Sequence, residues 1–200
     1  MWYVQQNSLG EQMIIDHLKN RDVPETARVF VDVEENLAYF TLFNLSGKIV
    51  GFMRYNPVGH KARGKWRKET TLLKYKTVVT KENDDRNVSH LALYGLHTLD
   101  ERPFVFVVEG IFDAVKLETL KLPVIATLTN DPKKLKNFFF ILSQTKDIIA
   151  WLDRDVSGKK LRKIAKHVIV TPEPYGDLGD MPIEEIKGAV GEELLRLEND

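Results

Sequence analysis

Two continuous apolar runs that each end in acidic residues constrain the fold of this chain more than any other feature. Residues 104–108 form the first run and Glu109 follows it; residues 148–152 form the second, and Asp153 and Asp155 follow it. Runs that are apolar on both faces are typical of buried parallel strands. Carboxylates at the carboxyl ends of such strands are expected at the ligand-binding edge of an open α/β sheet.

Extended and helical patterns alternate along the second half of the chain. Such alternation indicates βα units with right-handed crossovers, and therefore a mostly parallel sheet flanked by helices. The expected strands are 103–108, 123–127, 147–152 and 167–171, and the expected helices are 111–121, 131–143, 157–166 and Ile183–Leu197. Another helix is expected to begin at Ser89 and to carry Leu91, Leu93, Leu96 and Leu99. The three phenylalanines at 138–140 are expected in the core.

The first half of the chain predicts a small, mainly antiparallel α+β subdomain. Ser8 and Glu11 have the spacing of a capping box, so a short helix is expected to follow and to end before Pro24. Strand-forming residues predict strands at 28–33, 37–43, 48–54 and 71–79, with a hairpin turn at 44–47. We therefore divide the chain into a basic subdomain (1–82), an α/β domain (83–175) and an acidic motif with a final helix (176–200).

Charge is unevenly distributed, although the net charge is zero. Residues 47–81 contain ten Lys or Arg against Glu69 alone, whereas residues 171–200 contain nine acids against Lys187 and Arg196. Segregated charge of this kind indicates a charged partner. Cations interleaved with aromatic rings are typical of a groove for single-stranded nucleic acid. The candidates for this contact are Lys48, Arg54, Lys61, Arg63, Lys65, Trp66, Arg67, Lys74, Tyr75 and Lys76.

The absence of cysteine excludes disulfides, thiol chemistry and a zinc ribbon within this chain. The first residues lack the basic and apolar regions of a signal peptide, and no apolar run is long enough to span a bilayer. We therefore expect a cytoplasmic protein with no membrane contact.

The acidic residues at the two strand ends predict a metal site. Three converging carboxylates would repel each other unless cations lay among them, and hard ions such as Mg²⁺ prefer carboxylate and water oxygens. Simpler interpretations exist. Glu109 can cap the following helix, and Asp153 with Asp155 can form a solvated turn in which Arg154 makes an ion pair. Asp113 can orient Glu109 or cap the helix, and Gly158 can relieve crowding at a helix start.

The same residues resemble a known signature. Glu109-Gly110-x-x-Asp113 and Asp153-x-Asp155-x-x-Gly158 resemble the Toprim motifs shared by bacterial-type primases, topoisomerases and some nucleases. Four further blocks (47–54, 73–77, 93–96 and 177–180) resemble, in the same order, segments of DnaG-type primases. Together they cover roughly residues 37–187. The chain thus resembles the Toprim-containing RNA polymerase core of a bacterial or phage DNA primase.

The resemblance implies an enzyme of DNA replication that makes short RNA primers on single-stranded DNA by nucleotidyl transfer from NTPs. It implies Mg²⁺ or Mn²⁺ held by Glu109, Asp153, Asp155 and, further out, Asp180 rather than Asp177. Glu109 is either a metal ligand or the base, and Gly110, Asp113 and Gly158 support it. A replicative helicase of the primosome and a zinc-binding module are the implied protein partners in a bacterial cell. Either these parts belong to other proteins, or the chain is an excised core.

Two other functions fit the same residues. The acids can serve a Toprim-type nuclease that cleaves a phosphodiester, although the primase-like hairpin and the Lys74-Tyr75 pair speak against it. The chain can also be a non-catalytic module that only binds single-stranded DNA during replication.

Overall fold

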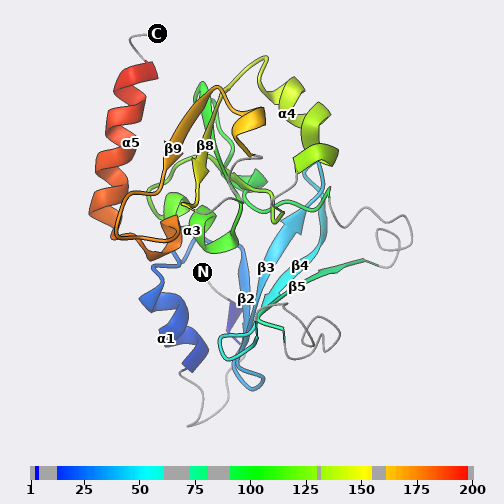
Figure 1. The fold of residues 1–200 in the computed structure, drawn as a ribbon. Helices are drawn as coiled ribbons and strands as arrows, with labels where there is room; N and C mark the ends of the chain where they lie inside the picture. Colours follow the sequence, from blue (N-terminus) through cyan, green and yellow to red (C-terminus); the bar gives the residue numbers. More distant parts are fainter. Residues whose placement is uncertain are drawn as a thin grey trace. The chain divides into compact units, whose positions relative to one another are not determined.

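A computed structural model describes residues 13–60, 73–80, 91–129, 132–154 and 161–197, together with the backbone of residues 3–4. The chain forms two compact units, Met1–Tyr94 and Gly95–Asp200. Figure 1 follows the chain from its amino to its carboxyl end.

The first unit contains a five-stranded sheet in the order β1-β2-β3-β4-β5. Strand β1 runs parallel to β2, and each of the other neighbours is antiparallel, as the sequence predicts for a mainly antiparallel unit. A turn at Asn44 closes the β3–β4 hairpin, because the Asn44 side-chain oxygen accepts hydrogen bonds from the backbone of Ser46 and Lys48. The elements are β1 (Tyr3–Val4), α1 (Met13–Asn20), β2 (Val29–Asp32), β3 (Leu37–Phe43), β4 (Ile49–Tyr55) and β5 (Tyr75–Val79).

Alternate residues of β2, β3 and β4 face a buried core in this unit. Phe40 and Tyr55 are fully buried, and α1 adds the buried side chains of Ile14 and Leu18. An alternation with a period of two is expected of a sheet that is covered on one face. The residues between the core positions therefore form a second, outer face.

The second unit contains a four-stranded parallel sheet in the order β7-β6-β8-β9. Together with its helices it is the α/β architecture that the sequence predicts. Helix α5 lies beside β9 (Figure 1), where Glu193 approaches His167 at 3.5 Å. The elements are η3 (Leu96–Thr98), β6 (Phe104–Val108), α3 (Ile111–Thr119), β7 (Val124–Ala126), η4 (Pro132–Leu135), α4 (Lys136–Leu142), β8 (Asp147–Leu152), β9 (His167–Val170), η6 (Leu178–Asp180) and α5 (Ile183–Leu197).

Helix α3 is buried on all sides from Ile111 to Glu118. Its three buried polar side chains each have a partner, as buried polar groups require. Asp113 accepts hydrogen bonds from two backbone N–H groups, Lys116 donates to the Met181 carbonyl at 3.1 Å, and Glu118 approaches His97 at 3.2 Å. The helix that follows Glu109 is thus fixed on every face.

The prediction of a helix that begins at Ser89 is wrong for the residues that the structure describes, which start at residue 91. Leu93 instead pairs with Phe43 in an antiparallel bridge, and Gly95 has a left-handed φ of 94°. A Cβ atom at Gly95 would lie 2.1 Å from the Val124 carbonyl oxygen, so this position requires glycine. Only the short turn η3 follows. The leucine spacing was misleading because Leu93 is buried in a strand-like contact.

Three smaller differences concern the other helices. The helix expected at 131–143 begins as the 3-10 turn η4 and becomes α4 only at Lys136. Residues 161–164 of the helix expected at 157–166 form a 3-10 turn, and residues 155–160 lie outside the described residues, as do Ser8 and Glu11. Phe139 is buried, but Phe140 is 67% exposed, because α4 has one outward face.

Among the helices that the structure describes, none is both long and apolar enough to cross a membrane.

Candidate active site

The candidate site is built at the carboxyl ends of two adjacent parallel strands. Strands β6 and β8 pair directly, with Val107 opposite Ala150. Glu109 is the first residue after β6, and Asp153 is the first residue after β8. Both are half-buried. Because the strands are parallel neighbours, their ends carry these two carboxylates to the same edge of the sheet.

The backbone at Glu109 is held by the end of β7. Thr127 N donates to the Val108 carbonyl and Leu128 N donates to the Glu109 carbonyl, both at 3.0 Å. Leu128 makes this contact with a φ of 54°, a left-handed conformation that is unfavourable for a bulky side chain. Backbone strain of this kind persists only where the surroundings enforce it, and here it lies beside the candidate site.

Asp113 joins the turn after Glu109 to a distant acidic turn. One of its carboxylate oxygens accepts a hydrogen bond from Gly110 N at 3.0 Å, and the other accepts one from Gly179 N at 2.9 Å. Asp113 is only 7% exposed. A buried carboxylate that accepts two N–H bonds fixes both donors. The Gly110 bond caps α3 and the Gly179 bond ties this turn to the acidic turn, so the geometry fits both roles considered for Asp113.

Asp177 and Asp180 occupy different environments in the acidic turn. The Asp177 carboxylate accepts a hydrogen bond from Asp180 N at 3.1 Å and caps η6, whereas the Asp180 side chain is exposed. Lys116 also binds this segment through the Met181 carbonyl. Asp177 thus caps η6, which is a structural role. The sequence did not reveal Lys116, because a lysine in a helix normally indicates a solvated face.

The segment after Asp153 is tied to the same part of the unit. Arg154 forms an ion pair with Glu173, and Arg154 N donates to the Gly176 carbonyl at 3.4 Å. The ion pair that the sequence suggested for Arg154 therefore involves Glu173. Asp155 and Gly158 lie outside the described residues.

No group of three or more His, Cys, Asp or Glu side chains that could hold a metal ion occurs among the residues with a described placement. Asp155, which the sequence places in the predicted group, is not among them. Oxygen ligands are nevertheless the donors that Mg²⁺ and Mn²⁺ prefer, so the side chains available here suit such an ion.

The predicted basic residues that the structure describes lie on β4 and β5 or next to them. Arg54 of β4 pairs in register with Lys76 of β5, and its guanidinium donates to the Leu73 carbonyl at 3.4 Å. The Lys74 ammonium lies 5.9 Å from the centre of the Tyr55 ring. Lys48 is exposed in the hairpin turn, and Tyr75 begins β5. Lys61, Arg63, Lys65, Trp66 and Arg67 lie outside the described residues.

The fold is that of a DnaG-type primase catalytic core. The primase fragment of the bacteriophage T7 primase-helicase protein has a TM-score of 0.53 and 19% identity, over 79% of this chain and 62% of that one. A DnaG catalytic core has a TM-score of 0.53 and 17% identity, over 96% of this chain and 64% of that one. A DnaG primase catalytic domain bound to ssDNA has a TM-score of 0.51 and 16% identity, over 92% and 65%.

These similarities concern the fold, since all three identities are low. The chain spans less than two thirds of the length of each of these three structures. No protein-family model and no curated protein sequence matches it. The resemblance stated from the sequence motifs is thus confirmed at the level of the fold.

Proposed function

We propose that this chain is the catalytic core of a DNA primase, which synthesises short RNA primers on single-stranded DNA. One observation carries the proposal. Within a primase-core fold, Glu109 and Asp153 follow the adjacent parallel strands β6 and β8 and share one edge of the sheet. That edge is where open α/β sheets bind their ligands.

The site would hold Mg²⁺ or Mn²⁺ through carboxylate oxygens. Glu109, Asp153, Asp155 and Asp180 are the residues that we assign to this role. When bound, a divalent ion neutralises the triphosphate and the negative charge that develops during transfer of its α-phosphoryl group. Hard oxygen donors are the correct ligand type for these ions, and cysteine is absent from the chain.

The reaction is attack of a 3′-hydroxyl on the α-phosphorus of an NTP, with loss of pyrophosphate. We assign to Glu109 either a ligand role or the removal of the hydroxyl proton. In both roles its position matters, and three contacts support that position: the Leu128 hydrogen bond to its carbonyl, the Thr127 bond next to it, and the Asp113 bond to Gly110. Asp113 is therefore a positioning residue.

Template and triphosphate would be held by cations of the first unit. Arg54, Lys74 and Lys76 lie on or next to paired strands, and Lys48 lies in the adjoining turn. We extend the proposal to Tyr75 and to Lys61, Arg63, Lys65, Trp66 and Arg67. Binding through such residues should weaken steeply with salt, because it releases counterions from the nucleic acid.

The proposed partners follow from the same assignment. One of the similar structures is bound to ssDNA, and another comes from a primase-helicase protein. For this chain we propose a single-stranded DNA template, a replicative helicase and a separate zinc-binding module as partners. We place it in the cytoplasm of a bacterial cell, encoded by the bacterium or by a phage.

Product analysis tests the proposal. The protein is incubated with a single-stranded template, labelled NTPs and Mg²⁺ or Mn²⁺, and both the products and the template are examined. A primase yields oligoribonucleotides and leaves the template intact. Shortened template would instead indicate a nuclease, and binding without either product would indicate a non-catalytic module; each of these two outcomes contradicts the proposal.

A further inference from the structure

The outer face of the first sheet carries aromatic side chains where polar ones are normally found. Val29 and Val31 of β2 are buried, but Phe30 between them is 38% exposed. Phe52 of β4 is 39% exposed, and Tyr39 of β3 is half-buried. The solvated face of an antiparallel sheet is usually polar, so a group of exposed aromatic rings is an informative exception.

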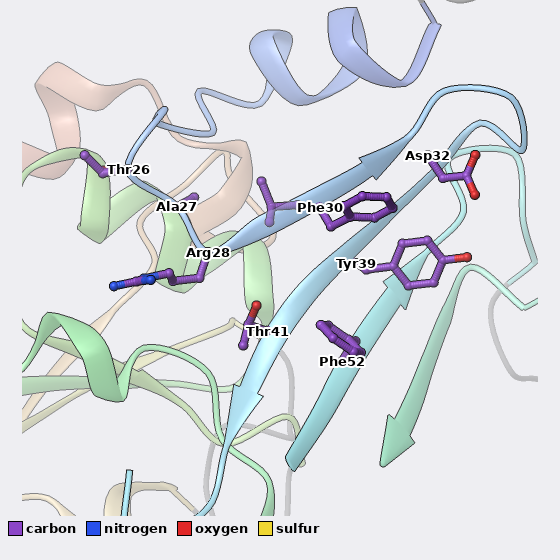
Figure 2. Close-up of a pocket in the computed structure, with 9 residues that line it drawn as sticks. Thr26, Ala27, Arg28, Phe30, Asp32, Tyr39, Thr41 and Phe52 are labelled. Carbon is purple, nitrogen blue, oxygen red and sulfur yellow. The ribbon is translucent and has the colours of Figure 1, made fainter. Parts of the chain in front are cut away.

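The three rings form a continuous surface. Phe30 lies opposite Tyr39 in the β2–β3 register, and their ring centres are 6.1 Å apart. The Tyr39 and Phe52 rings meet edge to face, with centres 6.5 Å apart. Tyr39 is thus the central ring, with one phenylalanine on each side, as Figure 2 shows.

A pocket of about 740 Å³ opens on this surface. In Figure 2, Arg28 lies at one end of the pocket and Asp32 at the other, with the rings between them. Thr41 adds a hydroxyl beside Arg28, and Thr41 N donates to the Arg28 carbonyl at 2.8 Å. The pocket therefore combines flat apolar surfaces with one exposed cation.

Further cations lie across the same face. Tyr39 is opposite Arg54, and Arg54 is opposite Lys76, so one row runs from an aromatic ring to two positive charges. Burial, and then the Asp32 carboxylate, raise the pKa of the Tyr39 hydroxyl, which stays neutral at physiological pH. No tyrosinate charge therefore repels an anion here.

We propose that this face binds single-stranded DNA, with unpaired bases stacked on Phe30, Tyr39 and Phe52 and phosphates directed toward Arg28 and the Arg54–Lys76 row. The choice of DNA as the ligand rests on the proposed primase function. The pattern itself favours a nucleic acid over a peptide, because aromatic rings offer every base a stacking surface and neighbouring cations pair with phosphates. Asp32 disfavours phosphate at its own end of the pocket, so the phosphates should gather at the Arg28 end.

Binding of a labelled oligothymidylate, measured by fluorescence anisotropy, tests this inference without any catalytic readout. Tyr39→Ala and Phe52→Ala should each weaken binding about tenfold, whereas Tyr39→Phe and Phe52→Tyr should stay within about twofold of the parent protein. Phe140→Ala removes a still more exposed ring from α4 and should change nothing. An oligomer of equal length with abasic sites should bind all of these proteins alike.

Two further measurements keep the outcomes distinct. In Phe52→Trp, the oligothymidylate should quench more tryptophan fluorescence than it does in the parent protein, whose own tryptophans include Trp66. The excess quenching reports stacking at position 52 even if an alanine variant is unstable. Glu109→Gln and Asp153→Asn should bind DNA normally, so loss of RNA synthesis would not affect this inference. Equal binding by the alanine variants and the parent, or equal losses for normal and abasic oligomers, would overturn it, as would an absence of excess quenching.

Discussion

Asp113 accepts a hydrogen bond from the backbone N–H of Gly179, 66 residues further along the chain, at 2.9 Å. Its second oxygen binds Gly110 N, the residue after Glu109. One buried carboxylate therefore connects the turn that carries Glu109 to the turn that carries Asp180. In the sequence, Asp113 is the last residue of the Glu109–Asp113 motif. In the fold, it links two parts of the candidate site.

Asp113→Asn should destabilise the protein by about 1–3 kcal/mol, because an amide nitrogen would face one of the two backbone donors and leave it without an acceptor. RNA synthesis should fall as well, since one of the two turns loses its anchor and the link between them is broken. Urea unfolding and the product assay measure the two effects. Asp100→Asn is the matched control: this exposed carboxylate pairs with Arg102 at the surface, and its loss should cost at most about 1 kcal/mol. Equal effects of the two substitutions would contradict the assigned role.

Gly95→Ala should be strongly destabilising, by about 2 kcal/mol or more. The new side chain would need a left-handed backbone and would meet the Val124 carbonyl oxygen. Gly188→Ala in α5 provides the comparison, because no atom lies within 4 Å of the added methyl group and alanine favours a helix, so stability should rise by up to about 1 kcal/mol. Thermal denaturation of both variants checks the prediction. A mild effect at Gly95 would mean that the backbone there adapts.

The hydrogen bond between His17 Nε2 and the Tyr55 hydroxyl, 2.6 Å long, should make stability depend on pH. Burial, followed by the charges of Arg21 and Lys74, holds the pKa of His17 below its ordinary value of 6.5. The unfolded chain therefore binds this proton more readily than the folded chain. The contribution of His17 to stability should be fully present above pH 6.5 and decrease as the pH falls below 6.5. Burial raises the pKa of Tyr55 to about 12, so stability should also decrease as the pH rises above 10.

Urea unfolding between pH 5 and pH 11 tests both limbs of this profile. His17→Gln should remove the acid limb and Tyr55→Phe the alkaline limb, while each keeps the other. A profile that either variant leaves unchanged would show that other groups cause the dependence.

Much of the fold was predictable because its strands have strong periodic patterns. Strands 37–43 and 147–152 were predicted with the bounds that the structure has, whereas the direct pairing of the strands before Glu109 and Asp153 was not predicted. The signal at 147–152 was strong because its continuous apolar run suits a strand that is buried on both faces, and the signal at 37–43 was strong because its residues are rich in strand formers. The prediction of a helix from Ser89 failed because the spacing of leucines carries no information about the backbone. Around residues 93–95 the backbone conformation is set by the left-handed Gly95 and by the Phe43–Leu93 bridge.

The supporting contacts of the candidate site could not be predicted. The bonds from Gly179 to Asp113 and from Lys116 to Met181 join segments far apart in sequence, and no local pattern encodes such pairs. The aromatic outer face was also missed. The alternation of buried and exposed residues along each strand assigns Phe30, Tyr39 and Phe52 to the solvent side. Only the pairing register of β2, β3 and β4 shows that the three rings are neighbours.

The most direct test of the central claim compares two aspartates at opposite ends of one strand. Asp147 begins β8 and pairs with Lys166, whereas Asp153 follows its carboxyl end. RNA synthesis on single-stranded DNA with Mg²⁺ should fall about 100-fold or more in Asp153→Asn and stay near the parent level in Asp147→Asn. Full synthesis by Asp153→Asn, with the parent protein active, would contradict the assignment of the site to the carboxyl edge of the sheet.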